Sequence, residues 1–340
     1  MIKIFFHLRG IGLAGTEVAV YNLISCLSKL NKYDITVGYE SSNNSKIMID
    51  KFKKYAKVEK MRGKYETDVL VYCFYSIKNG ENDIINNIIR KKTIFWQHFF
   101  GKNCILNNPN FRKSVNRIVC VSEFAKQHFI DLEKLDNSIK NKIDVIYNVI
   151  NVNEILQKSN ETIDLDFFSS LNLVTVSRIN YAKGFKRMIK LAELLEKKKI
   201  DYKWYIIGEE YDNCIERNTI IESFKKFGER IQFLGELENP YNIMAKCDYT
   251  VLLSDIETWG FVITESKILD IPCIVTNFKS VYEQIEDGKT GIIVDKESTD
   301  KYSIKLDKIM EQKLKLKENL KKFKYNNESI IQYWDNLLSK

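Results

Sequence analysis

Short runs of apolar residues alternate along the chain with longer stretches whose apolar positions recur at helical spacing. This alternation is typical of parallel β-sheets covered by helices, because strands buried on both faces form continuous apolar runs. Glu17–Lys29, for example, places its apolar residues on one helical face. In the first half of the chain the predicted strands are Ile2–Leu8, Ile35–Tyr39, Val69–Phe74, Thr93–Trp96, Ile118–Ser122 and Val145–Tyr147.

The same alternation restarts after a polar stretch, at about 151–170, that we interpret as a linker. The predicted strands of this second half are Leu173–Val176, Trp204–Ile207, Ile231–Phe233, Tyr249–Leu253, Cys273–Thr276 and Gly291–Val294, with helices at Phe185–Lys197, Cys214–Phe227, Tyr241–Lys246 and Phe261–Leu269. We therefore expect an α/β protein with two Rossmann-like domains, residues 1–160 and 161–322, whose parallel sheets face a central cleft. A last helix near Ile330–Leu338 could join either domain.

The composition excludes several classes of protein. With 340 residues, 44% of them hydrophobic, and only 14 glycines and 3 prolines, the chain is neither disordered nor collagen-like. No apolar run is long enough to span a bilayer, and the N-terminus does not resemble a signal peptide. The seven scattered cysteines and three histidines predict reduced thiols, a cytoplasmic protein and no structural zinc.

Positive charge is concentrated in the first domain. Residues 1–155 hold 24 Lys and Arg against 15 Asp and Glu, or +9, whereas the remainder holds 29 against 30, or −1. The excess gathers in Lys51–Lys64 and Arg90–Lys92. Such a face could attract anionic lipid head groups at the inner face of a membrane, a phosphorylated substrate or nucleic acid, and a solvated helix surface explains it equally well. Because no nucleic-acid-binding motif accompanies the charge, we do not expect a nucleic acid partner.

Two carboxylates eight residues apart, Glu257 and Glu265, lie in the loop after a predicted strand and in the helix that follows. Gly260 lets the backbone approach a ligand, and the free N–H groups of Gly260, Phe261 and Val262 would point at an anion. Glu265 could accept hydrogen bonds from a ribose, and Glu257 could bind sugar hydroxyls. Ser254-x-x-Glu257 fits a helix capping box equally well when it is taken in isolation.

Two cations shift that balance toward a binding site. Arg178 and Lys183 follow the first strand of the second domain and would lie at the same sheet edge as Glu257. They could neutralise a diphosphate leaving group without a metal ion. Cations that merely flank a helix start are less attractive, because they oppose the helix dipole.

The first domain offers weaker signals. Gly10-x-Gly12-x-x-Gly15 joins the first strand to the first helix and matches a dinucleotide-binding pattern, but no acidic residue ends the next strand before Glu40. A dinucleotide site therefore stays open as a minor alternative. His98 follows a strand and could donate to a sugar hydroxyl or carry a proton, although a histidine among aromatics is more often structural. We interpret Asp164-Leu-Asp166, a DxD match within the linker, as coincidental.

Several of these segments together resemble the family 4 retaining glycosyltransferases of GT-B fold. The resemblance covers about residues 5–295 and rests on Gly15–Glu17, His98, Val121–Phe124, Val145–Asn148, Arg178–Phe185, Phe233–Gly235, Glu257–Glu265 and Asp287–Val294. It implies two Rossmann-like domains, a nucleotide-sugar donor bound mainly by the second, and a C-terminal helix, 323–340, that packs back on the first. It also implies retention at the anomeric carbon and no metal or other cofactor.

The resemblance also implies roles for single residues. Arg178 and Lys183 would hold the diphosphate, Glu265 the ribose and Glu257 the donor sugar. The amides at Gly260, Phe261 and Val262 would bind phosphate and sugar, Gly15 would belong to a glycine loop beside the donor, and His98 would act on the acceptor side. Thr258 stands where the family usually has glycine, which puts the fit of the donor sugar in question.

The function expected from these features is transfer of a hexose or N-acetylhexosamine from a nucleotide sugar, UDP-linked, to a glycan or lipid-linked saccharide. The reaction would serve polysaccharide synthesis for the cell envelope, with the protein cytoplasmic and its peripheral attachment to the membrane an open question. Two alternatives remain: a non-catalytic GT-B-like subunit that binds a glycan or a partner transferase, and a nucleotide-sugar epimerase, which would need no acceptor.

Overall fold

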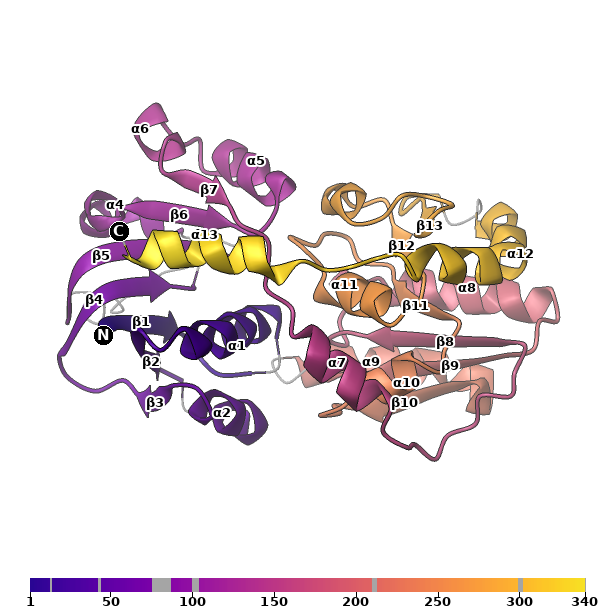
Figure 1. Ribbon diagram of the computed structural model, residues 1–340. Coiled ribbons are helices and arrows are strands. Elements are labelled where there is room, and N and C mark those ends of the chain that lie inside the picture. Colours follow the sequence, from indigo (N-terminus) through magenta and orange to yellow (C-terminus); the bar gives the residue numbers. More distant parts are fainter. Residues whose placement is uncertain are drawn as a thin grey trace. The chain divides into compact units, whose positions relative to one another are not determined.

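The computed structural model describes residues 1–12, 14–41, 44–74, 87–99, 104–209, 213–298 and 302–339, without the side chains of 302–304. The chain forms two compact units, the first made of Met1–Ile150 and Asn326–Lys340 and the second of Asn151–Tyr325. Each unit is built on one parallel sheet with helices against its faces (Figure 1). The predicted α/β class with two parallel sheets is therefore confirmed.

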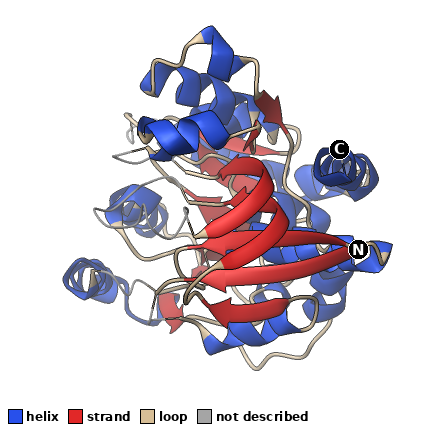
Figure 2. Cartoon of the chain, turned by 90° about the vertical axis from the view of Figure 1, so that its left-hand side faces the viewer, coloured by secondary structure: helices blue, strands red, loops and turns tan. Residues whose placement is uncertain are grey.

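The first unit contains a seven-stranded parallel sheet in the order β3-β2-β1-β4-β5-β6-β7. Its strands fan out across the view of Figure 2, with helices on either side. In chain order its elements are β1 (Ile2–Leu8), α1 (Gly15–Leu27), η1 (Ser28–Leu30), β2 (Tyr33–Tyr39), α2 (Lys46–Lys53), β3 (Lys57–Lys60), β4 (Tyr65–Tyr72), β5 (Ile88–Gln97), η2 (Ile105–Asn107), α4 (Pro109–Ser114), β6 (Arg117–Cys120), α5 (Glu123–Leu132), α6 (Asn137–Lys140), β7 (Ile143–Val145) and α13 (Asn327–Ser339).

The last helix, α13, packs within the first unit although its sequence follows the whole of the second. Trp334 is fully buried and its ring meets the Trp96 ring edge-on, with centroids 4.6 Å apart. Asp335 accepts hydrogen bonds from the Tyr33 hydroxyl at 2.6 Å and from the Lys32 ammonium at 2.7 Å. The buried contact between the two tryptophan rings and the hydrogen bonds of Asp335 therefore hold this helix beside β2 and β5.

The second unit contains a six-stranded parallel sheet in the order β10-β9-β8-β11-β12-β13. Chain order reverses between β8 and β11, so the two strands that begin the two halves of the sheet are neighbours. The elements are α7 (Val152–Ser159), β8 (Leu171–Val176), η3 (Tyr181–Lys183), α8 (Phe185–Lys197), β9 (Tyr202–Ile207), α9 (Cys214–Phe224), η4 (Lys225–Arg230), β10 (Ile231–Gly235), α10 (Tyr241–Met244), β11 (Tyr249–Leu252), α11 (Phe261–Ile268), β12 (Cys273–Thr276), η5 (Lys279–Glu283), β13 (Gly291–Val294) and α12 (Tyr302–Leu320).

A buried hydrogen-bonded chain crosses the middle of this sheet. The Trp204 indole N–H donates to Thr175 Oγ1 at 3.0 Å, and the Thr175 hydroxyl donates to the Val251 carbonyl at 3.0 Å. Both side chains are fully buried, where an unmade hydrogen bond would cost about 1–3 kcal/mol. These two hydrogen bonds connect β9, β8 and β11 close to the loops that leave the carboxyl ends of these strands.

The polar stretch predicted as a linker contains a helix, so that prediction is wrong in part. Asn151 caps α7 by accepting from the Glu154 N–H, and Ile155 is buried. The helix packs against α10 and α11, which assigns it to the second unit. The division between the units therefore falls after Ile150 and not at residue 160.

One strand escaped prediction altogether. The four residues of β3, Lys57–Lys60, pair only with β2 and form the edge of the first sheet. Lysines at both ends of this short edge strand disfavour pairing with a further strand. Because the strand is rich in charged residues, it contains no apolar run from which it could be predicted. In the part of the chain that the structure describes, no helix is long and apolar enough to cross a membrane.

Candidate functional site

Two loops that carry predicted site residues leave adjacent strands of the second sheet. Arg178 and Lys183 follow β8, and Glu257 follows β11. The two strands are paired in parallel, so their carboxyl ends lie at one edge of the sheet. Because the strand order reverses between them, this edge is the topological switch point, where open α/β sheets bind their ligands.

Gly184 determines where Lys183 lies. Its φ of +81° is in the left-handed region, and a Cβ there would come within 1.8 Å of the Leu253 carbonyl oxygen. Only glycine combines that conformation with that approach. The loop after β8 therefore packs directly on the end of β11, an arrangement reinforced by the hydrogen bond from the Asp255 N–H to the Ala182 carbonyl at 2.9 Å.

Arg178 lies on the other side of the same loop. A Cβ on Gly208, at the end of β9, would come within 1.9 Å of the Ser177 carbonyl oxygen, so the chain after β9 runs tightly beneath this turn. The Arg178 side chain is exposed, and within the described ranges no hydrogen bond or ion pair engages its guanidinium. An exposed guanidinium with its donors uncommitted suits an anionic ligand.

Glu257 pairs with Lys183 across the two loops. The ammonium donates to Glu257 Oε1 at 2.7 Å, and the Ser254 hydroxyl donates to the same oxygen at 2.7 Å. Both charged side chains are mostly buried, with 21% of Lys183 and 14% of Glu257 exposed. The capping-box interpretation of Ser254 and Glu257 is wrong, because no helix begins there and Ser254 binds the carboxylate instead of a backbone amide.

Three polar side chains, one at the end of β12 and two on the segment after it, hold the Glu257 loop in place. The Thr276 hydroxyl donates to the Ser254 carbonyl at 2.6 Å, and the Ser280 hydroxyl donates to the Glu257 carbonyl at 2.7 Å. The Gln284 amide donates to the Trp259 carbonyl. Sequence reasoning missed these positioning residues, and the only signal they carried was a series of polar residues beside a buried strand.

The helix α11 begins directly after this loop. Gly260 precedes it with φ +84°, and no side-chain hydrogen bond caps the first turn. Its eight residues, Phe261–Ile268, thus begin with backbone N–H groups available for an anion. Glu265, one turn further on, is 9% exposed, and Tyr241 donates its hydroxyl proton to Glu265 Oε1 at 3.2 Å.

Two of the predicted site residues belong to the first unit. Gly15 is the first residue of α1, and His98 follows β5, so both lie at the carboxyl edge of the first sheet. His98 is 7% exposed, and its ring packs on Trp96 with centroids 4.4 Å apart. Burial lowers the pKa of His98 to about 3, so the ring is neutral near pH 7. A neutral ring suits a hydrogen bond to a sugar hydroxyl better than proton delivery.

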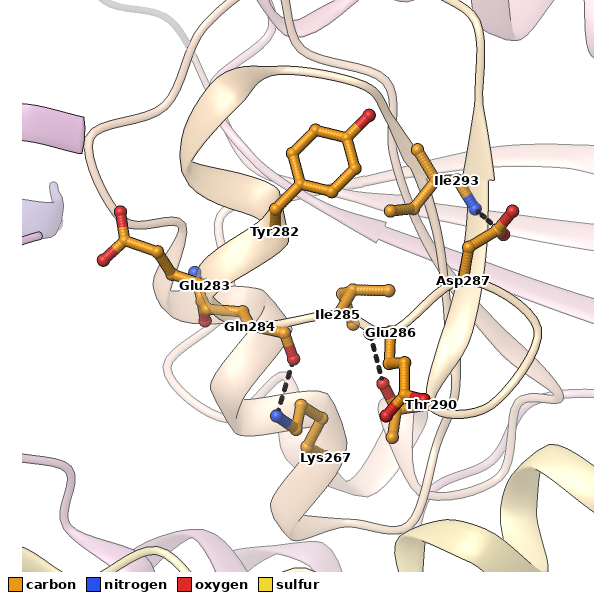
Figure 3. Close-up of a pocket in the computed structure, with 9 residues that line it drawn as sticks. All are labelled: Lys267, Tyr282, Glu283, Gln284, Ile285, Glu286, Asp287, Thr290 and Ile293. Carbon is orange, nitrogen blue, oxygen red and sulfur yellow. Dashed lines mark hydrogen bonds between the residues drawn. The ribbon is translucent and has the colours of Figure 1, made fainter. Parts of the chain in front are cut away.

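A pocket of ≈ 580 Å³ lies elsewhere on the second unit, between α11, η5 and β13 (Figure 3). Figure 3 shows Glu283 turned away from the Tyr282 ring, and Lys267 reaching Gln284, whose carbonyl accepts its ammonium at 2.7 Å. None of the predicted site residues lines this pocket. The pocket is lined by residues of the segment that holds the Glu257 loop and by Lys267, near the carboxyl end of α11. The switch-point edge lies at the amino end of that helix.

The described residues contain no cluster of side chains that could form a metal site. No group of three or more His, Cys, Asp or Glu side chains there is placed to hold a metal ion. Asp164 and Asp166, the DxD match, lie between α7 and β8 outside any regular element. Asp166 engages the chain itself, its carboxylate accepting from the Phe168 N–H at 2.9 Å.

The switch-point edge therefore combines two cations, an uncapped helix start and a carboxylate that two donors orient. Such a combination can bind a diphosphate through Arg178, Lys183 and the α11 amides. It can also accept hydrogen bonds from hydroxyl groups through Glu257.

The chain is similar in sequence to known glycosyltransferases. Residues 169–328 match the sequence profile of the family described as Glycosyl transferases group 1. A curated relative is the N-acetylgalactosamine-N,N'-diacetylbacillosaminyl-diphospho-undecaprenol 4-alpha-N-acetylgalactosaminyltransferase of Campylobacter jejuni, 27% identical over 55% of this chain and 52% of the relative. Another is the N-acetyl-alpha-D-glucosaminyl L-malate synthase of Bacillus anthracis, 25% identical over 44% of this chain and 40% of the relative. The chain thus spans about half the length of these curated relatives.

Solved structures extend the likeness to the whole fold. HepE of Anabaena, solved in complex with UDP and glucose, superposes with a TM-score of 0.78 over 100% of both chains at 15% identity. A glycosyltransferase from Rickettsia africae superposes with a TM-score of 0.76 over 99% of this chain and 97% of its own, also at 15% identity. The second unit is therefore similar in sequence to the glycosyl transferases group 1 family, and the chain as a whole has the GT-B fold.

Proposed function

We propose that this protein is a retaining glycosyltransferase that moves a hexose or N-acetylhexosamine from a UDP-sugar to a saccharide. The acceptor is a growing glycan or a lipid-linked saccharide of a bacterial surface polysaccharide. The observation that carries the proposal is the joining of Arg178, Lys183 and the Glu257 loop at the switch point of the second sheet. Diphosphate and sugar ligands need cations and a hydroxyl acceptor side by side.

Each residue of that edge has a proposed task. Arg178, Lys183 and the amides at Gly260, Phe261 and Val262 bind the donor diphosphate and stabilise the charge that develops as the sugar leaves. Glu257 accepts hydrogen bonds from the donor sugar. Glu265, held by Tyr241, accepts from the ribose hydroxyls.

Retention is proposed to follow from attack on the face that the diphosphate leaves. The acceptor hydroxyl loses its proton to a phosphate oxygen of the donor, a new C–O bond forms at the anomeric carbon, and the bond to UDP breaks. No enzymic nucleophile is needed, and the cations of this chain take the place of a metal ion. In the first unit, His98 donates a hydrogen bond to the acceptor and Gly15 lets the backbone approach the ligand.

The relatives support the choice of donor and acceptor. HepE was solved with UDP and glucose, which favours a UDP-linked donor. The Campylobacter relative is named for transfer to a diphospho-undecaprenol saccharide, which favours a lipid-linked acceptor. Both inferences extend to this chain through the shared fold and the matched segment.

We also propose peripheral attachment to an anionic membrane, where lipid-linked acceptors lie. The carboxyl end of α2 and the strand β3 expose a group of cations: Lys53, Lys54, Lys57, Lys60, Arg62 and Lys64. Basic segments gain about 1 kcal/mol per cation near an anionic surface. Cosedimentation with vesicles that contain phosphatidylglycerol, weakened by salt and absent with phosphatidylcholine alone, is the expected result.

Thermal shift against UDP, GDP, ADP and CMP, with and without EDTA, tests the donor site. A nucleotide at one hundred times its dissociation constant adds about 2.7 kcal/mol of stability. We expect a shift with UDP that EDTA leaves unchanged. It should be lost in Glu265→Ala and kept in Glu238→Ala, whose carboxylate is 61% exposed on the same unit.

Turnover of a UDP-sugar panel tests the chemistry. Arg178→Ala should lose transfer while the protein still binds UDP through Lys183 and the α11 amides. Near-normal turnover in Arg178→Ala would contradict the assignment. Absence of a shift with every nucleotide would overturn the enzyme proposal and favour a non-catalytic partner subunit.

A further inference from the structure

A second group of charged and aromatic side chains lies at the carboxyl edge of the first sheet. Arg9 follows β1, Glu40 follows β2, Phe74 follows β4 and Phe99 follows β5. All four strands are parallel, so these residues emerge at one edge, and β1 and β4 form the switch point of this sheet. None of the four was a predicted site residue.

Glu40 is held from below by a buried histidine. His7 Nε2 lies 2.5 Å from Glu40 Oε1, and the histidine is 2% exposed. Its ring stacks flat on the Tyr72 ring, with centroids 4.7 Å apart and an angle of 6° between planes. His7 Nδ1 is buried, and no hydrogen-bond partner reaches it within the described ranges. The proton of a neutral ring therefore lies on Nε2 and is donated to Glu40.

The backbone joins Arg9 and Glu40, but their side chains do not pair. The N–H groups of Glu40 and Ser41 both donate to the Arg9 carbonyl, at 3.2 and 2.8 Å. The Arg9 guanidinium lies over the Phe74 ring instead, 5.0 Å from its centroid, and Phe74 meets Phe99 edge-on at 5.4 Å. In the described part of the chain Glu40 Oε2 and the Arg9 N–H groups have no hydrogen-bond partner. One acceptor group and one donor group thus remain available at the ends of two paired strands, β1 and β2.

The chemistry of this group selects its ligand. A carboxylate accepts hydrogen bonds from hydroxyls and repels phosphates, a guanidinium donates to hydroxyl and ring oxygens, and aromatic rings pack on the apolar face of a sugar. The side chain of Glu40 is 18% exposed, which leaves it reachable while His7 fixes its orientation. A neutral, polyhydroxylated ring satisfies all three requirements.

We propose that Arg9, Glu40 and Phe74 form a saccharide-binding subsite on the first unit, with His7 as the residue that positions Glu40. The assignment of this sugar to the acceptor rests on the proposed function, whereas binding of the sugar itself does not. The residues of this subsite follow strands of the first sheet, whereas Arg178, Lys183 and Glu257 follow strands of the second.

Saturation-transfer NMR on the full chain tests the proposal, with the methyl glycosides of glucose, galactose, N-acetylglucosamine and N-acetylgalactosamine as probes. At least one glycoside should give a signal that Glu40→Gln weakens at least tenfold in affinity. The matched control is Glu59→Gln, on β3 of the same unit, whose carboxylate is 27% exposed and pairs with Lys57. It should bind as the wild type does.

Two further variants separate positioning from folding. His7→Leu should weaken glycoside binding severalfold, and His7→Gln, which keeps an N–H donor, should restore part of it. The comparison uses variants whose thermal unfolding stays cooperative. If neither histidine variant folds, glycoside binding by Glu40→Gln alone tests the subsite.

The outcomes for this subsite and for the donor site are distinguishable. A UDP shift without any glycoside signal, or equal binding by Glu40→Gln and wild type, overturns the subsite and leaves the transferase proposal intact. A glycoside signal lost in Glu257→Gln but kept in Glu40→Gln places the sugar at the donor residues and also overturns it. A signal lost in Glu40→Gln without any UDP shift supports the subsite while the proposed donor site fails.

Discussion

Lys183 and Glu257 form an ion pair at 2.7 Å although 74 residues separate them in the chain. The pair joins the loops after two adjacent strands, and both side chains are mostly shielded from water. Each charge is therefore already neutralised before any ligand binds. In the proposed function, a donor diphosphate would compete with Glu257 for the ammonium, and that competition would free the carboxylate for a sugar hydroxyl.

Substitution of Lys183 and substitution of Glu257 should change the affinity for the nucleotide in opposite directions. Lys183→Met should weaken UDP binding by about 10-fold to 100-fold, because a hydrogen bond between charged groups contributes about 1.5–3 kcal/mol. Glu257→Gln should strengthen UDP binding modestly, since the competing charge is gone, and should lower the rate of sugar transfer. Isothermal titration with UDP and turnover of a UDP-sugar measure the two effects.

Lys190→Met is the control for this pair, because Lys190 lies on α8 and is 60% exposed. It should leave both measurements unchanged. Tighter UDP binding in Lys183→Met would show that the ammonium serves only to hold Glu257, and the phosphate role would then be wrong.

Gly184→Ala should destabilise the second unit and disturb its site. The new Cβ would meet the Leu253 carbonyl oxygen at 1.8 Å, so the loop after β8 must move and carry Lys183 with it. Gly63→Ala is the matched control, since Gly63 has the same φ of +81° with open space around it. Gly63→Ala should lower the free energy of unfolding by about 1–2 kcal/mol, the cost of a left-handed backbone conformation for alanine. Urea unfolding should show a larger loss for Gly184→Ala, accompanied by weaker UDP binding; equal losses would contradict the packing argument.

The sequence pattern predicted those parts of the molecule that depend on local order along the chain. Apolar runs located the buried strands, and the residues after β8 and β11 were placed correctly at one edge because parallel strands share their carboxyl ends. The pattern could not identify β3, whose lysines conceal it, or the helix α7 in a polar stretch.

Contacts between segments far apart in the chain were beyond prediction. Ser280 and Gln284 brace the Glu257 loop, but nothing in their sequence separates them from surface polar residues. The spacing of Ser254 and Glu257 fits a helix cap and a serine that holds a carboxylate equally well, so the spacing alone could not separate the two interpretations. The pairing of His7 with Glu40 is likewise visible only when β1 and β2 are side by side. The assigned roles of Arg178, Glu265 and His98 remain predictions.

Trp334→Ala should destabilise the first unit, even though the substitution lies beyond the whole second unit in sequence. The indole is fully buried against Trp96, and truncation of a buried tryptophan costs about 3–5 kcal/mol. Tyr333→Ala is the neighbouring control, because Tyr333 is 67% exposed. Denaturation followed by tryptophan fluorescence and by circular dichroism measures both variants, and a Trp334→Ala protein as stable as Tyr333→Ala would show that α13 is not anchored by this ring.

His98 should make the folded chain lose stability as the pH falls below about 6.5. Burial lowers the pKa of His98 to about 3 in the folded state, whereas the unfolded chain has an ordinary histidine pKa near 6.5. Between these values the unfolded state binds the extra proton, so the free energy of unfolding decreases with decreasing pH, by about 2 kcal/mol between pH 7 and pH 5. Urea unfolding at the two pH values measures this loss, which should be about 2 kcal/mol smaller in His98→Gln.

The shared titration of other groups cancels in the comparison between variants. Equal losses in wild type and His98→Gln would mean that the folded protein protonates His98 at an ordinary pH. In that case the imidazolium is available near neutrality, and His98 would return as a candidate to deliver a proton instead of a neutral hydrogen-bond donor to the acceptor.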